Sequence, residues 1–266
     1  MSIFTSSFKH SLCLFLLIQL ASTASASPEA RVELSQAEES LTPLSTVNPD
    51  AFRVLFIGNS ITRHGVKENI GWHHVSGMAA SEENKDYVHI LASKLRNELS
   101  PTPVDLYNHT GGSGSVIRRF KTIDQVLVVR PNLVVIQLGE HEKPETGLQN
   151  IRDAYHGLVR TVTELQTKPI VICVGPWAGL IGNYGNEEER MTRAKLEYSG
   201  FKGQVQGIMR DVCERHGSPF VSVADLTLEP NYFGFGDTWG VRWHPNDRAH
   251  AMYADRIYRA FNKVRR

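Results

Sequence analysis

A serine and a histidine that stand far apart in the chain are the residues best suited to covalent chemistry. Ser60 follows the apolar run 54–57 and stands in the turn Gly58-Asn59-Ser60. A serine at the carboxyl end of a buried strand lies where ligands bind in open α/β sheets, and it can act as a nucleophile. His244, in the segment Trp243-His244-Pro245-Asn246, could take the proton of that serine. The pair predicts acyl transfer through a serine nucleophile.

The elements that must position this pair alternate along the chain from residue 51 onward. We expect strands at 54–57, 104–107, 133–138, 170–174 and 220–223, and helices at 87–99, 116–129, 148–165, 187–216 and 246–264. Apolar strands that alternate with amphipathic helices favour a parallel sheet covered on both faces. The sequence therefore predicts an α/β fold, a three-layer αβα sandwich with about five strands.

Length, charge and the N-terminal segment set the class of protein. The 266 residues, 41% of them hydrophobic, suffice for one domain at 51–266. The net charge of +1 provides no electrostatic footprint for nucleic acid, so no nucleic-acid partner is expected. Residues 1–26 have the features of a signal peptide: a short apolar run at 12–20, and Ala24-Ser25-Ala26 as a small-x-small cleavage site.

These N-terminal features predict a secreted or periplasmic protein. The apolar run is too short to span a bilayer, so we expect no stable membrane insertion after cleavage. Residues 27–50 are rich in Ser, Pro, Glu and Thr and are interpreted as a linker or N-terminal arm.

Two cysteines, Cys173 and Cys213, remain after the signal peptide. A disulfide is permitted outside the cytoplasm. However, Cys173 lies in an expected core strand and Cys213 in an expected helix. We predict two buried free thiols.

Two further loops follow expected strands, namely Gly111-Gly112-Ser113-Gly114 and Gly139-Glu140-His141-Glu142. With the serine turn and the terminal histidine they form four blocks, whose order resembles the SGNH (GDSL-like) hydrolase family over most of residues 52–264. Gly58-Asn59-Ser60-Ile61 stands where that family has Gly-Asp-Ser-Leu, and the block at 139–142 matches only in part. The resemblance implies a flavodoxin-like sheet and hydrolysis of esters, from lipids to acetylated sugars, with no cofactor.

The family pattern also implies roles for individual residues. Ser60 would attack the acyl carbonyl, and His244 would take its proton. The oxyanion would be bound by the backbone N–H of Ser60, by a glycine N–H from Gly112 or Gly114, with Gly112 slightly favoured, and by the residue at the family's asparagine position. That residue is His141 here, which can donate one N–H. Loss of one oxyanion donor costs roughly 3 kcal/mol in comparable enzymes.

A second departure concerns the group that orients His244. The family usually has an aspartate three residues before the histidine, where this chain has Val241. Either a backbone carbonyl holds the imidazole, which gives a Ser-His dyad, or Asp237 reaches it through the loop. Asp247 is better placed to cap the first turn of the last helix.

Substrate contacts are expected from residues in loops at the same edge of the sheet. Exposed aromatic side chains there would stack on sugar rings, and ordinary loop packing is the alternative. Arg242 could bind an anionic group such as a uronate, or it is a solvated charge. The residues assigned to substrate binding are Asn59, Trp72, Glu140, Trp177, Arg242 and Trp243, with Tyr184 and Trp239 also near these loops.

We therefore predict a secreted serine esterase that removes an acyl group, such as acetyl, from a carbohydrate or another ester. The alternative is a catalytically impaired carbohydrate-binding protein of the same fold, which the departures at His141 and Val241 motivate. A third possibility is a metal-dependent hydrolase that uses the histidines. Adjacent residues such as His73 and His74 point to different sides of an extended segment and seldom ligate together, so no metal site is predicted.

Overall fold

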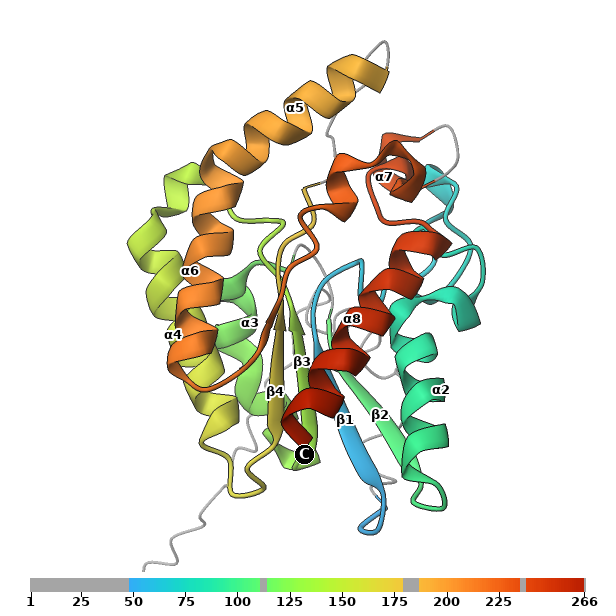
Figure 1. Cartoon of the computed structure of the whole chain (residues 1–266), viewed down its shortest axis with the longest axis vertical. Helices are drawn as coiled ribbons and strands as arrows, with labels where there is room; N and C mark the ends of the chain where they lie inside the picture. The colour runs from blue at the N-terminus through green and yellow to red at the C-terminus, as the bar shows by residue number, and fades with distance from the viewer. Residues whose placement is uncertain (1–47, 111–113, 179–186, 235–237, 266) are drawn as a thin grey trace, which may run out of the picture.

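A five-stranded parallel sheet forms the centre of the molecule (Figure 1). The computed structural model describes residues 48–110, 114–178, 187–234 and 238–265. The strands are β1 (Phe52–Ile57), β2 (Val104–His109), β3 (Leu133–Gln137), β4 (Ile170–Val174) and β5 (Phe220–Val221), in the order β2-β1-β3-β4-β5. Helices cover both faces, so the predicted αβα sandwich is confirmed.

Alternate side chains of β1 show how the sheet divides the core into two. Val54 and Phe56 face the helices α2 (Tyr87–Leu99) and α8 (Asp247–Arg265). Leu55 and Ile57 face α3 (Val116–Thr122), α4 (Leu148–Thr163) and α6 (Phe201–Arg215). All four side chains are fully buried. Successive strand residues point to opposite faces, which explains why this strand is apolar throughout rather than alternating.

The strand order creates a topological switch point beside β1. The chain passes from β1 to β2 on one side and then crosses to β3 on the other side of β1. The loops after β1 and β3 therefore diverge at the carboxyl edge of the sheet, where open α/β sheets bind ligands. Ser60 and His141 lie in these two loops.

The helices differ from the sequence prediction in two places. The single helix expected at 187–216 is two helices, α5 (Glu187–Ser199) and α6, because Gly200 (φ −102°, ψ −135°) leaves the helical region. The helix expected at 116–129 tightens after α3 into a 3₁₀ segment, η4 (Ile123–Val129). A short helix, α7 (Trp239–Arg242), precedes α8. Among the described residues, no helix is long and apolar enough to cross a membrane.

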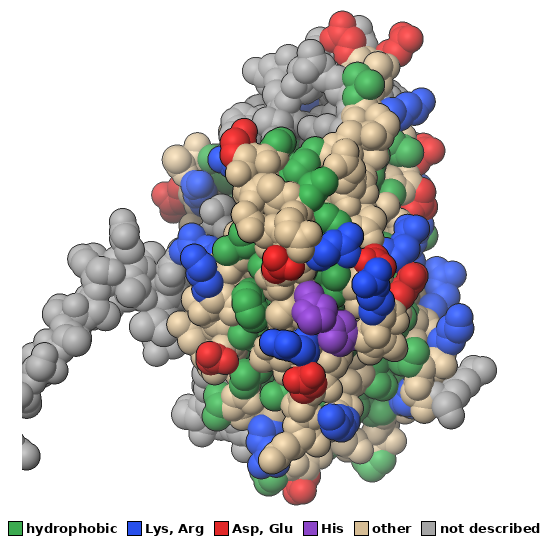
Figure 2. Space-filling model, turned by 90° about the vertical axis from the view of Figure 1, so that its left-hand side faces the viewer, with side chains coloured by type: hydrophobic (Ala, Val, Ile, Leu, Met, Phe, Trp, Pro, Cys, Tyr) green, Lys and Arg blue, Asp and Glu red, His purple; other side chains and the backbone are tan. Residues whose placement is uncertain are grey.

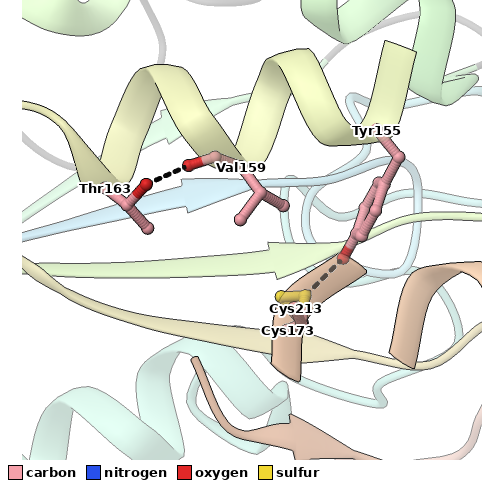
Figure 3. The surroundings of a disulfide bond; sticks show 5 residues. All are labelled: Tyr155, Val159, Thr163, Cys173 and Cys213. Atoms are coloured by element: carbon pink, nitrogen blue, oxygen red, sulfur yellow. Dashed lines mark hydrogen bonds between the residues drawn. A yellow bond between two sulfur atoms is a disulfide. The ribbon is translucent and has the colours of Figure 1, made fainter. Parts of the chain in front are cut away.

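The prediction of two free thiols is wrong, because Cys173 and Cys213 form a disulfide (Figure 3). Cys173 is on β4 and Cys213 on α6, their Cα atoms are 6.5 Å apart, and both side chains are buried. The Tyr155 hydroxyl lies 3.4 Å from the Cys213 sulfur. Helix α6 packs directly on β4, which brings together two residues 40 positions apart. Which side of α6 faces the strand was not evident from the sequence.

The outer side formed by α4 and α6 carries charges of both signs, and two histidine side chains lie together on the same face (Figure 2). Asp211 on α6 pairs with Arg152 of α4 and, at 2.8 Å, with Arg215 of its own helix. The rings of His156 and His216 have centroids 5.0 Å apart. Such exposed pairs contribute little to stability, and the sulfur bridge and the core hold α6 in place.

Candidate active site

The turn that carries Ser60 is held by its neighbour Asn59. The Asn59 side-chain oxygen accepts the Ile61 N–H at 3.0 Å, and its backbone carbonyl accepts the N–H groups of Thr62 and Arg63 at 3.0 Å each. The Ser60 carbonyl accepts the Met78 N–H at 2.9 Å. These bonds fix the backbone on both sides of Ser60 and leave its side chain part-exposed at the carboxyl edge of the sheet.

His244 reaches this serine from the segment between α7 and α8. Its Nε2 lies 2.7 Å from the Ser60 Oγ, and its Nδ1 lies 2.6 Å from the Gly240 carbonyl oxygen. A carbonyl can only accept, so Nδ1 carries the proton and Nε2 is free to accept one from Ser60. Burial lowers the pKa of His244 to about 3, which keeps the ring neutral. The arrangement is that of a serine beside a correctly oriented general base.

The Gly240 carbonyl supplies the orienting contact that the sequence left open between a backbone carbonyl and Asp237. Asp237 lies outside the described residues, whereas Val241 is buried in a small apolar cluster with Trp72, Met78 and Ala79. Asp247 accepts hydrogen bonds from the backbone N–H and the hydroxyl of Ser81 at 2.6 and 2.7 Å.

Three groups that can donate to an oxyanion belong to the serine turn and to the loops beside it. The Ser60 N–H has no hydrogen-bond acceptor within the described part of the chain. Gly114 packs against the serine turn so closely that a Cβ there would lie 2.9 Å from the Asn59 Cβ and 3.0 Å from the Gly58 carbonyl. Gly112 lies outside the described residues. The half-buried His141 lies in the loop after β3, and its ring centroid is 6.3 Å from that of Trp243.

The surroundings of His141 favour the neutral form of its ring. Burial lowers its pKa, and the positive charges of Lys202 and Arg119 add to this effect. Lys202 donates from Nζ to the carbonyls of Gly139 and Glu140, at 3.1 and 2.6 Å, so it also fixes the loop that carries His141. A neutral imidazole retains one N–H that it can donate.

Glu140 does not face a substrate, and its assignment to substrate binding is not what the structure supports. The side chain is buried, and its two oxygens accept three hydrogen bonds: from the Asn59 amide at 2.5 Å, from the Gln137 amide at 2.5 Å and from the Trp177 N–H at 2.7 Å. Asn59 is likewise fully buried. Both side chains are buried and bonded within the protein, so they support the serine turn and do not contact a substrate.

The expectation of exposed aromatic side chains is also wrong for three tryptophans. Trp72, Trp177 and Trp243 have 1%, 0% and 8% of their surface exposed. The Trp177 indole N–H donates to the Trp243 carbonyl at 2.7 Å. They pack beneath the loops, which is the alternative that the sequence left open. Arg242 is exposed, Trp239 has no described side chain and Tyr184 lies outside the described residues.

Sequence reasoning missed several residues that support the site. Arg119 is buried and donates from Nε to the Gly58 carbonyl at 2.9 Å. His250 accepts the Tyr87 N–H at 3.3 Å through Nδ1, so its Nε2 donates to the Met78 carbonyl at 3.2 Å. The one available signal was a polar residue inside an apolar strand, as at Gln137 of β3. In the described ranges, no three His, Cys, Asp or Glu side chains form a group that could hold a metal ion.

The comparisons with known proteins identify the family of this chain. Residues 56–252 match the model of the GDSL-like Lipase/Acylhydrolase family, and the chain belongs to that family. It is therefore an enzyme that hydrolyses ester bonds. No curated protein matches this sequence significantly.

Solved structures with the same fold include several esterases. A protein from Parabacteroides merdae described as a GDSL-like lipase has a TM-score of 0.58 and 16% identity, over 81% of this chain and 98% of that one. A two-domain esterase (CEX) active on acetylated mannans has a TM-score of 0.56 and 19% identity, over 80% of this chain and 50% of that one. A catalytic mutant of Axe2, an acetylxylan esterase from Geobacillus stearothermophilus, has a TM-score of 0.53 and 17% identity, over 82% of this chain and 95% of that one.

Proposed function

We propose that this enzyme is an exported serine esterase that removes an acetyl group from a carbohydrate, with Ser60 and His244 as a catalytic dyad. The observation that carries the proposal is the 2.7 Å contact between the Ser60 hydroxyl and the His244 Nε2, in a ring whose Nδ1 is bonded to the Gly240 carbonyl. The two residues are 184 positions apart in the chain, and the fold brings them into contact.

In the first half of the reaction, the Ser60 Oγ attacks the acyl carbon and His244 takes the hydroxyl proton at Nε2. The negative oxygen of the tetrahedral intermediate is bound by the N–H groups of Ser60 and Gly114 and by the ring N–H of His141. His244 then returns the proton to the departing sugar hydroxyl, which leaves an acyl group on Ser60. Water attacks that ester with His244 again as the base, and Ser60 is regenerated.

A dyad without a carboxylate is chemically sufficient for this role. The orienting partner must hold the tautomer with the proton on Nδ1, and a backbone carbonyl does so because it can only accept. The carbonyl supplies a dipole rather than a full negative charge, so the imidazolium that forms is less stabilised than in a triad.

Three observations support the choice of an acetylated carbohydrate and of export. Structural relatives act on acetylated mannans and on acetylxylan, and the fold shared with them covers most of the domain. The N-terminal 26 residues have the features of a signal peptide. The Cys173–Cys213 disulfide is of the kind that persists in oxidising compartments.

The test compares four proteins on an aryl acetate: the mature enzyme, Ser60→Ala, His244→Ala and the control Ser199→Ala. The Ser199 hydroxyl is exposed on α5 and donates to the Leu196 carbonyl of its own helix. We expect both dyad variants to lose about a thousandfold or more in kcat. Ser199→Ala should retain full activity. Full activity in Ser60→Ala would refute the serine mechanism.

The substrate and the alternative function are tested on the same proteins. Acetate release from acetylated xylan and mannan, dependent on Ser60, would support the carbohydrate assignment. A fluorophosphonate should label the wild type and not Ser60→Ala. Glycan binding with neither turnover nor labelling would instead support the binding-protein alternative. Sequencing of the exported protein's N-terminus checks cleavage after Ala26.

A further inference from the structure

Glu140 is a buried carboxylate next to the serine turn, and its two oxygens accept three hydrogen bonds. Its Oε2 accepts the Asn59 side-chain amide, and its Oε1 accepts both the Gln137 amide and the Trp177 backbone N–H. Burial raises its pKa, while the hydrogen bonds and the nearby charge of Lys202 act in the opposite direction. A buried carboxylate is tolerated only when its oxygens are satisfied in this way.

Two of the residues that donate to Glu140 are connected to the two members of the proposed dyad. Asn59 precedes Ser60 in the chain; its amide nitrogen donates to Glu140, and its single side-chain oxygen accepts the Ile61 N–H at 3.0 Å. Trp177 uses its backbone N–H for Glu140 and its indole N–H for the Trp243 carbonyl, which precedes His244. One carboxylate therefore anchors the residue before the serine and, through one tryptophan, the residue before the histidine.

We propose that Glu140 and Asn59 form a positioning pair that sets the distance between Ser60 and His244. The proposal rests on the proposed dyad and adds residues that act through it rather than on the substrate. It also accounts for the amide in this chain's Gly-Asn-Ser turn, where the family's usual block has aspartate. Opposite a buried Glu140, an aspartate at 59 would put two carboxylates at the distance of a hydrogen bond, and like charges so close cannot both remain ionised.

Exchanging the carboxylate and the amide between positions 140 and 59 distinguishes a positioning role from simple packing. In Glu140→Gln, the new amide group would face a donor whichever way it turned, because donors stand at both of its oxygen positions. In Asn59→Asp, the new carboxylate would face Oε2 of Glu140. In the double variant, the amide at 140 keeps its oxygen toward Gln137 and Trp177 and donates to the carboxylate at 59. Charge, size and the number of hydrogen bonds are all conserved.

The experiment measures kcat, KM and the fluorophosphonate labelling rate for the two single variants and for the double variant. We expect each single change to lower kcat by about tenfold or more with little change in KM, because a buried group is left unpaired. The double variant should recover to within about threefold of the wild type. Should a single variant fail to fold, the proposal requires the double variant to be both folded and active.

The matched control uses Glu142→Gln, a second buried carboxylate two positions away. Glu142 accepts the Val116 N–H at 2.6 Å, whereas the Asn59 amide donates to Glu140. Combined with Asn59→Asp, its effect should simply add, so no rescue is expected. Equal coupling in both cycles, or a Glu140→Gln/Asn59→Asp variant no better than its worse parent, would overturn the positioning pair.

Ser60→Ala, measured in the same series, separates this proposal from the proposed function. If that variant keeps its activity, the dyad itself is refuted. If it loses activity and the exchange fails to rescue, the dyad stands and only the positioning pair is rejected.

Discussion

Reduction of the Cys173–Cys213 disulfide should destabilise the fold by a predictable amount. The bridge closes a segment of 40 residues between β4 and α6 (Figure 3). Loop-closure entropy for a segment of that length is about 13 cal/mol/K, which corresponds to about 4 kcal/mol of unfolding free energy at 25 °C. For a domain of this size, 1 kcal/mol shifts Tm by about 2–4 °C, so we expect Tm to fall by about 8–16 °C.

The assay is thermal and urea unfolding of the mature enzyme, with and without a strong thiol reductant. A double Cys173→Ala/Cys213→Ala variant serves as the control, because the reductant should not change its Tm. Turnover of the folded reduced enzyme should change little, because the nearest polar contact of the bridge is the Tyr155 hydroxyl rather than the dyad. An unchanged Tm on reduction, or two thiols that react with a maleimide in the denatured and unreduced protein, would refute the reasoning.

Burial lowers the pKa of His244 to about 3, so kcat/KM, which reports the free enzyme, should stay at its plateau to about pH 4; an acid limb with a midpoint near pH 6.5 would contradict this. The folded pKa of His244 lies below the unfolded value of about 6.5, so this group should lower stability as the pH falls below about 6.5, measured by urea unfolding. Gly114→Ala should lower kcat by about tenfold or more, since a Cβ would press on the serine turn. At Gly207 on α6 a Cβ meets nothing within 4 Å, so Gly207→Ala should instead raise stability by about 0.5–1 kcal/mol in thermal unfolding, without a change in kcat. Trp177→Phe removes the hydrogen bond to the Trp243 carbonyl and should lower both Tm and kcat; unchanged values of both would show that this bond does not help to hold the histidine segment.

Much of the fold was predictable because its signals are local. The apolar runs that predicted the strands lie in β1 to β5, with differences of a few residues at their ends. Helix α2 has the bounds expected from its pattern. The break in the helix expected at 187–216 also had a local cause, because Gly200 interrupts it although the amphipathic pattern continued on both sides.

Part of the candidate site could be found in the same way. Ser60 and His141 follow expected strands, and parallel strands bring their carboxyl ends to one edge, so the sequence already implied that they lie close together. Backbone groups cannot be assigned in this way, because every residue has a carbonyl. The Gly240 oxygen that holds His244 was therefore visible only as an unnamed alternative.

The sequence by itself determined the class of chemistry and the residue types available for it: a serine after the first strand, a histidine before the last helix, and a parallel sheet between them. The tertiary structure alone decided which way side chains point. It turned Glu140 inward beneath Asn59, buried Trp177 and Trp243 under the loops, and brought Cys173 to Cys213. The physical reason is that periodicity reports which face of an element is apolar, whereas the partner of a buried polar or sulfur atom depends on contacts between segments far apart in the chain.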